Sequence, residues 1–223
     1  MVTALSRRAG HGAGAPPDRV VVWQSAGLLL AYPDGDSVAR MALVEGAAGG
    51  LPEQVRTPLL AAAAHILGRP LIEAQQEYVQ TFDWKRRRAL FLSYWTAGDT
   101  RNRGQAILRF ARVYRAAGVV PPSDELADHL AVVLEFAATV DPDAGYDLLA
   151  EHRTPVAMLR DALAEARSPY ALVLGAVCST LPEPGPDDLA TARRLAATGP
   201  PVEAVGLEPF PTPLPFPTAE VPR

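Results

Sequence analysis

The chain has 223 residues, of which 48% are hydrophobic and 21% charged, with a formal net charge of -4 and a pI near 5.6. This length is enough for one full core, and a hydrophobic fraction dominated by Ala favours helices over strands. The acidic balance excludes a global basic surface that would collect nucleic acid or an anionic membrane. The single cysteine, Cys178, excludes a disulfide or a thiolate metal site within one chain and is expected to be a small buried side chain.

The N-terminal segment 1–16 is predicted to be disordered and to carry no export signal. An arginine pair, Arg7 and Arg8, precedes an apolar run, but Gly, Pro and Asp18 separate the two, and no cleavage site follows. No other stretch reaches the roughly 18 apolar residues needed to span a bilayer. The sequence therefore predicts a soluble, cytoplasmic protein.

Most of the remaining chain is predicted to be helical, with starts and ends marked by capping residues, Gly and Pro. The predicted helices cover 18–32, 37–48, 52–67, 70–82, 101–117, 124–140, 145–153, 155–167 and 169–181, with a short aromatic turn at 91–95. Pro58 lies inside the third helix and is expected to kink or split it. The predicted fold is an all-α, single-domain helical bundle over residues 17–181.

The composition changes after Leu181, because half of the 22 prolines follow it. Apart from a short helix at 187–197, the segment 182–223 is predicted to be a proline-rich tail, mostly extended or disordered. Its stretch EPFPTPLPFPT, residues 208–218, has a polyproline-like pattern that could dock along the domain or along a partner.

Arg103 heads the apolar stripe of the predicted helix 101–117, while Arg101 lies on its polar face. A guanidinium in that position requires a carboxylate or carbonyl partner, because an unpaired buried charge costs several kcal/mol.

The predicted helix 124–140 is apolar nearly all round, except for one narrow stripe. Asp124, Asp128 and Glu135 share that stripe, with His129 beside it. Two interpretations are open. The acids either face solvent or pair with the arginines of 101–117, or they line a cleft and meet a ligand's positive charge.

No H-E-x-x-H, C-x-x-C, glycine-rich phosphate loop or G-x-S-x-G is present. Of the four histidines, only His129 has acids nearby, so a metal or acid-base site there is a minor alternative. The basic run 85–88 is either a solvated connection or a contact for an acidic or phosphate-bearing partner. With the arginines of 101–115, it leaves a nucleic-acid-binding module as an alternative. The main prediction is a binding protein without enzymatic activity or cofactor.

Three motifs make the chain resemble a known family. They are YVQTFD (78–83), LFLSYWTAGDTRNRGQAILRF (90–110) and DELADHLAVVLEFA (124–137), with YRAAGV at 114–119. With these motifs the chain resembles the NarJ family of nitrate reductase molybdenum-cofactor assembly chaperones, part of the redox-enzyme maturation chaperone group. The match covers about 18–181. Gln80 departs from the pattern, which usually has an acid there, and the run 85–88 is more basic than expected.

The resemblance implies an all-helical fold with no bound cofactor. It also implies a cytoplasmic protein that binds the N-terminal segment of the apo catalytic subunit of respiratory nitrate reductase, and that releases it to its membrane partner after the molybdenum cofactor is inserted. Proteins of molybdenum cofactor biosynthesis are further expected partners, and a related molybdoenzyme is the alternative client. Neither nucleic acid nor direct membrane insertion is expected.

The same resemblance, with the aromatic and charged character of the motifs, gives ten candidate peptide-binding residues. They are Tyr78, Phe82, Asp83, Tyr94, Arg101, Arg103, Gly104, Asp128, His129 and Glu135. A basic amphipathic partner helix is expected to lay its apolar face on the aromatic residues and to direct its charges toward the acids.

Overall fold

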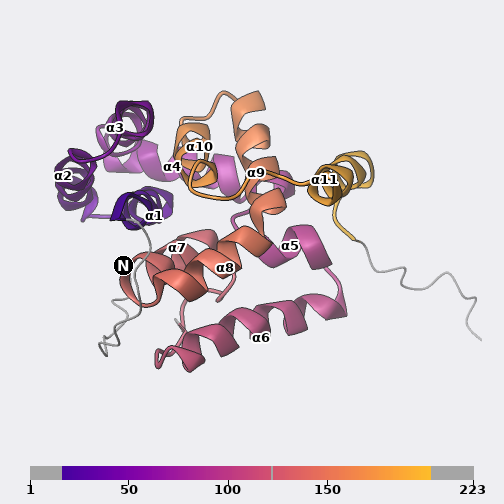
Figure 1. The fold of residues 1–223 in the computed structure, drawn as a ribbon. Coiled ribbons are helices and arrows are strands. Elements are labelled where there is room, and N and C mark those ends of the chain that lie inside the picture. The colour runs from indigo at the N-terminus through magenta and orange to yellow at the C-terminus, as the bar shows by residue number, and fades with distance from the viewer. Residues whose placement is uncertain (1–16, 122, 202–223) are drawn as a thin grey trace, which may run out of the picture.

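Eleven α-helices and one 3₁₀ turn make up the described part of the structure, a computed structural model that describes residues 17–121 and 123–201 (Figure 1). The helices are α1 (Pro17–Leu30), α2 (Ser37–Ala48), α3 (Glu53–Leu67), α4 (Leu71–Phe82), α5 (Leu92–Ala97), α6 (Arg101–Ala116), α7 (Leu130–Thr139), α8 (Pro142–Glu151), α9 (Arg153–Glu165), α10 (Tyr170–Cys178) and α11 (Pro186–Thr198), with η1 (Arg86–Arg88) between α4 and α5. No β-strand occurs in these residues, so the predicted all-α fold is confirmed.

Helices α1, α7 and α10 form the centre of the bundle, and their facing side chains are fully buried. Trp23 of α1 is completely enclosed, and its indole N–H donates to the Thr180 hydroxyl at 2.9 Å. Gly145 lets α8 lie directly against α7, because a Cβ there would come within 2.3 Å of the Ala137 Cβ. The central helices therefore have fixed positions around a continuous apolar core.

The helix predicted at 124–140 begins later than expected, at Leu130, and its predicted start was wrong. Residues before Leu130 pair with the segment that leads into α5. Leu130 N–H donates to the Leu90 carbonyl at 2.8 Å, and Leu92 N–H donates to the Asp128 carbonyl at 3.1 Å. These long-range backbone hydrogen bonds replace the first helical turns, so Asp124, Asp128 and Glu135 do not share one helical stripe.

Helix α3 runs as one helix through Pro58, so of the expected kink or split the split was wrong, and the kink stays a prediction. Pro58 lies near the start of the helix, where its missing N–H removes one intrahelical hydrogen bond. The buried face that follows, with Leu59 and Ile66 in the core, holds the rest of the helix in place.

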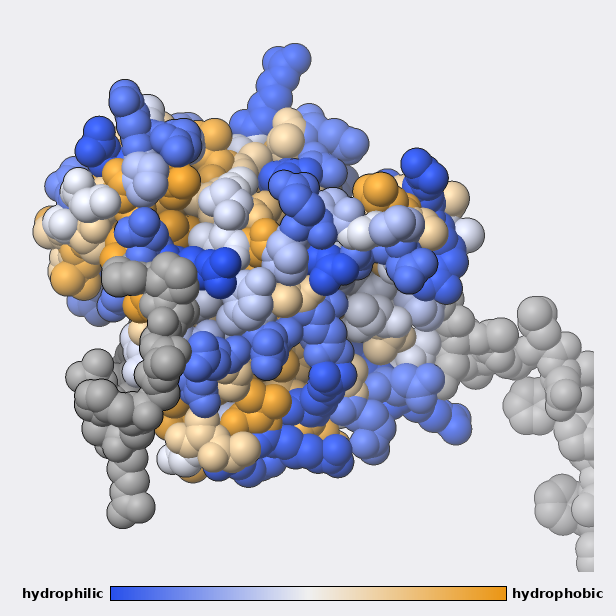
Figure 2. All heavy atoms as spheres, in the orientation of Figure 1, coloured by the Kyte–Doolittle hydropathy of each residue, from blue (hydrophilic) through white to orange (hydrophobic). Residues whose placement is uncertain are grey.

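Helix α6 carries five arginines and no acidic residue, and it buries Phe110, Ala111 and Tyr114. Hydrophilic residues lie along the lower edge of the molecule in Figure 2, beside a hydrophobic patch, in the region where α6 lies in Figure 1. This helix therefore gives one edge of an acidic protein a basic surface.

Helix α11 lies where the short helix 187–197 was expected, and it packs on α9 (Figure 1). Asp188 accepts hydrogen bonds from the Arg153 Nε at 3.0 Å and from the Thr154 hydroxyl at 3.1 Å. The domain boundary at residue 181 stays a prediction. The expectations for 1–16 and 202–223 lie outside the described residues.

Among the helices of 17–121 and 123–201, none is both long enough and apolar enough to cross a bilayer.

Candidate functional site

A groove of about 240 Å³ lies between α1, α7 and the segment that precedes α7. Its apolar wall comes from Leu28 and Ala31 of α1 and from Val132 of α7. Gly27 lies where the two helices approach, and a Cβ there would stand 3.5 Å from the Ala131 carbonyl oxygen. The small side chains at this crossing leave an open apolar strip between the helices.

Two tyrosines, Tyr32 and Tyr78, also line the groove. The Tyr78 hydroxyl donates to the Leu30 carbonyl at 3.1 Å, and the Tyr78 and Tyr32 rings meet edge to face at 5.3 Å. Tyr32 is 47% exposed, so its ring can contact a ligand. The Arg40 guanidinium is engaged, because it donates to the Tyr32 carbonyl at 3.0 Å and to Asp34 at 2.6 Å.

Three carboxylates, Asp124, Glu125 and Glu135, line the rest of the groove. Burial raises the pKa of both Glu125 and Glu135 above the usual value for glutamate. Within the described residues, the Glu135 carboxylate has no hydrogen-bond or ion-pair partner. A partly desolvated carboxylate without a cation is poised to bind a positively charged group.

His129 adds a neutral polar group to this wall. Burial lowers its pKa to about 4, so the imidazole is uncharged near pH 7. Its Nδ1 is buried without a hydrogen-bond partner in the described part of the chain, and its ring lies against Phe91. His129 therefore does not offset the negative charge of the acids.

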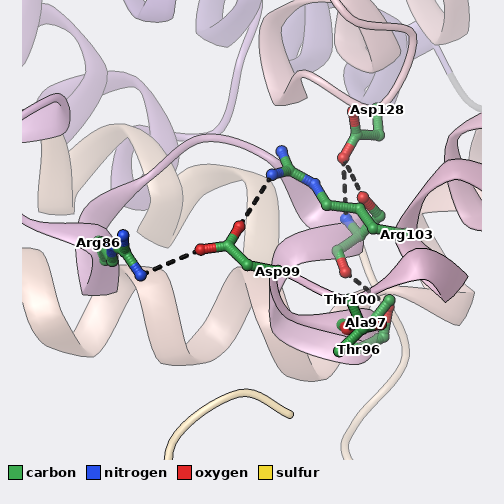
Figure 3. Close-up of polar contacts among 8 residues, drawn as sticks. Arg86, Thr96, Ala97, Asp99, Thr100, Arg103 and Asp128 are labelled. Carbon is green, nitrogen blue, oxygen red and sulfur yellow. Dashed lines mark hydrogen bonds and ion pairs between the residues drawn. The ribbon is translucent and has the colours of Figure 1, made fainter. Parts of the chain in front are cut away.

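Asp128 is fully buried and does not line the groove. One of its carboxylate oxygens accepts hydrogen bonds from the Ser93 N–H at 3.1 Å and the Ser93 hydroxyl at 2.5 Å, at the start of α5 (Figure 3). The other oxygen has no hydrogen-bond partner among the described residues. Asp128 thus ties α5 to the segment that carries Glu125 and His129.

Arg103 forms an ion pair with Asp99, four residues earlier in the sequence. The two side chains lie 3.3 Å apart, and Asp99 also binds the exposed Arg86 at 3.0 Å (Figure 3). The guanidinium lies 5.3 Å from the centre of the Phe91 ring and 6.0 Å from that of Tyr94. The requirement for a carboxylate partner is met without Glu135.

The ten predicted site residues divide among three places. Tyr78, His129 and Glu135 line the groove. Phe82 and Asp128 are buried away from it, and Phe82 packs between Tyr78 and Tyr170.

The remaining five predicted residues lie outside the groove lining. Tyr94, Arg101, Arg103 and Gly104 lie on α5 and α6, and Asp83 is the exposed C-cap of α4. The Asp83 charge contributes to the raised pKa of Glu125. A binding role for each of the ten stays a prediction.

Sequence reasoning missed the contribution of α1, α2 and the link between them, from Leu28, Arg40 and Tyr32 respectively. One signal was available for Arg40, which shares the buried stripe of α2 with Val44 and Ala48. An arginine on an apolar stripe indicates a paired or functional guanidinium. Among the described residues, no group of three or more His, Cys, Asp or Glu side chains could hold a metal ion.

Comparisons with known proteins give matches of three kinds. A family model described as nitrate reductase delta subunit matches residues 48–174. The nitrate reductase-like protein NarX of Mycobacterium tuberculosis is 46% identical over 168 residues, which are 72% of this chain and 24% of NarX. This chain therefore spans about a quarter of that relative.

NarJ of Bacillus subtilis, named as a probable nitrate reductase molybdenum cofactor assembly chaperone, is 29% identical over 171 residues. The aligned part covers 74% of this chain and 90% of that protein. A crystal structure of an Archaeoglobus fulgidus protein, described as a candidate redox enzyme maturation protein, matches with a TM-score of 0.53 and 27% identity. It covers 78% of this chain and 98% of its own.

Proposed function

Because this chain belongs to the nitrate reductase delta subunit family, we propose that it is an assembly chaperone for molybdenum cofactor insertion into nitrate reductase. The resemblance found in the three motifs is thus confirmed at the level of the family. The proposed client is the apo catalytic subunit, bound in the cytoplasm through its N-terminal segment. The groove between α1 and α7 is the proposed binding site.

The observation that carries this proposal is the Glu135 carboxylate, which has no partner among the described residues and belongs to an acidic wall of Asp124, Glu125 and Glu135 beside an apolar strip. An amphipathic helix that binds in a groove places its apolar face on the floor and its charged flanks on the rim. Here Leu28 and Val132 supply apolar contact, and Glu125 and Glu135 supply negative charge. A client segment with basic residues beside an apolar face fits both.

The proposed action is binding rather than catalysis. The chaperone holds the N-terminal segment while the cofactor enters the catalytic subunit, and releases it afterwards. Since Asp128 fixes the segment that carries Glu125 and His129, the acidic wall is in place before the client arrives. A preorganised site loses less entropy on binding.

Isothermal titration calorimetry tests the binding step. The titrant is a synthetic peptide that copies the N-terminal residues of the nitrate reductase catalytic subunit from the same genome. We expect micromolar or tighter binding with a negative heat-capacity change from apolar burial. Glu135→Gln keeps the shape of the side chain and removes its charge, so the affinity should fall about five- to tenfold, or about 1 to 1.4 kcal/mol.

Glu165→Gln is the matched control, because Glu165 is exposed near the end of α9 and is absent from the groove lining. Its affinity should equal that of the wild type. Equal losses in both variants would count against the groove. A peptide from a related molybdoenzyme that binds more tightly would instead reassign the client and leave the groove in place.

A further inference from the structure

A second pocket, of about 400 Å³, lies where α11 faces α5 and α9. Trp95 and Thr96 of α5, Pro155 of α9 and Leu195 of α11 form its walls. Residues 199–201, where the described chain ends, complete its rim. It shares no lining residue with the groove between α1 and α7, and the function proposed above does not use it.

Trp95, one of the residues that line this pocket, carries a hydrogen-bond donor that nothing in the described residues uses. Its side chain is 3% exposed, and the indole N–H is buried without an acceptor. An indole nitrogen can only donate, and a buried donor without a partner costs about 1 to 3 kcal/mol. An acceptor brought in by a ligand would remove that cost.

A proline-rich segment has the matching chemistry. Prolines have no backbone N–H, and a polyproline II segment makes no internal hydrogen bonds, so its carbonyl oxygens are unused acceptors. Aromatic-lined grooves bind such segments by packing on the proline rings. Trp95, Pro155 and Leu195 line this pocket with apolar side chains, of which only a small part is exposed.

We propose that the Trp95 pocket is a binding site for a proline-rich segment, and that its occupant is residues 208–217 of this chain. That segment alternates proline with Phe210, Thr212, Leu214 and Phe216. Its carbonyls supply acceptors for the Trp95 N–H, and its phenylalanine and leucine side chains supply apolar contact.

The course of the chain favours its own tail over another ligand. Pro201 lines the pocket, so the chain leaves the described structure at the site itself. Gly98 makes this course possible, since it has a positive φ of 60° and a Cβ there would lie 1.7 Å from the Pro201 carbonyl oxygen. Six residues, 202–207, then precede the segment.

These six residues can span at most about 20 Å when extended, which is enough for a short return to the pocket. A short tether of this kind gives the segment an effective concentration in the millimolar range. A weak pocket would therefore be filled by its own tail before a free peptide could compete.

Nuclear magnetic resonance of the full chain with ¹⁵N-labelled tryptophan tests this proposal. The chain has three tryptophans, Trp23, Trp84 and Trp95, and a Trp→Phe variant of each assigns its indole signal. In the triple variant Phe210→Ser, Leu214→Ser and Phe216→Ser, the Trp95 signal should shift and its proton should exchange with solvent roughly tenfold faster. The Trp23 and Trp84 signals should not move.

The matched control changes two tether residues instead, Val202→Ser and Val205→Ser, and should leave the Trp95 signal unchanged. A synthetic peptide of residues 208–218 added to the triple variant should restore the wild-type signal. Identical Trp95 shifts and exchange rates in the wild type and the triple variant would overturn the proposal. A Trp95 signal that changes on dilution of the wild type would overturn the assignment to the chain's own tail, because the occupant would then come from a second copy.

Discussion

The Asp128 carboxylate caps the start of α5 from a different segment of the chain, through the Ser93 N–H and hydroxyl. Removing one member of a buried charged network usually destabilises a protein by several kcal/mol. Variants at Asp128, and at the buried Phe82, therefore report on folding rather than on direct contact with a ligand. Glu135, partly exposed and without a partner in the described residues, is the better position for testing the groove.

His129 gives a prediction for the pH dependence of stability. Burial lowers its pKa to about 4 in the folded state, whereas an unfolded histidine has a pKa near 6.5. Between these values the unfolded chain binds more protons, so the free energy of unfolding falls as the pH falls from about 6.5 toward 4. The loss from this residue should be about 3 kcal/mol by pH 4.

Urea denaturation at pH 7.5 and at pH 4 measures this loss as the difference between the wild type and His129→Gln. The raised pKa values of Glu125 and Glu135 act in the opposite direction, since the folded state retains their protons longer. They are present in both proteins and largely cancel in the difference. His65→Gln, at an exposed position, should follow the wild type. Parallel curves for His129→Gln and the wild type would contradict the prediction.

At the scale of helices, local signals predicted most of the described elements. Ser37 and the Gly49–Gly50 pair placed α2 correctly, and Gly118 correctly predicted the end of α6. The start of α7 was missed because the residues before it pair with 90–92, a contact between segments far apart in sequence. Local propensity contains no information on such pairing.

The candidate site was likewise predictable in its local features and not in its long-range contacts. The motifs identified the residue types, and the requirement of Arg103 for a carboxylate was met by Asp99. The orientation of Asp128 depended on where α7 begins, so the sequence could not predict it. The wall contributed by α1 and α2 depended on helix packing, for which the motifs had no signal.

Helix α11 gives a prediction at this scale, because one carboxylate makes several of its contacts with the body. Asp188 binds Arg153 and Thr154 of α9 and accepts from the Gly185 N–H at 2.8 Å. Loss of these bonds should let α11 open more often. In Asp188→Ala, amide hydrogen exchange along α11 should therefore become roughly tenfold faster, while α7 stays protected.

Asp187→Ala is the matched control for this experiment, since Asp187 is the exposed neighbour in the same helical turn. It also removes one carboxylate from the first turn of α11, but it breaks no hydrogen bond to Arg153. Equal exchange rates in the two variants would show that Asp188 does not hold α11 to the body.

At the scale of the molecule, charge is separated between two surfaces. Five arginines lie on α6, whereas Asp124, Glu125 and Glu135 line the groove between α1 and α7, and Figure 1 shows where these helices lie. The proposed basic client segment would be attracted to the groove and repelled by α6, which would favour one docking position. The uneven charge therefore adds to the specificity that shape alone provides.

The proposed assembly role predicts a defect in cells that lack this chain. The nitrate reductase catalytic subunit should accumulate with little molybdenum, because its N-terminal segment is not held while the cofactor is inserted. Molybdenum per subunit, measured by mass spectrometry on the isolated enzyme, is the readout. Glu135→Gln should restore it only in part, in line with its weaker peptide binding, and Glu165→Gln should restore it fully at equal protein levels. Full molybdenum content in the absence of the chain would limit its role to peptide binding and remove it from cofactor insertion.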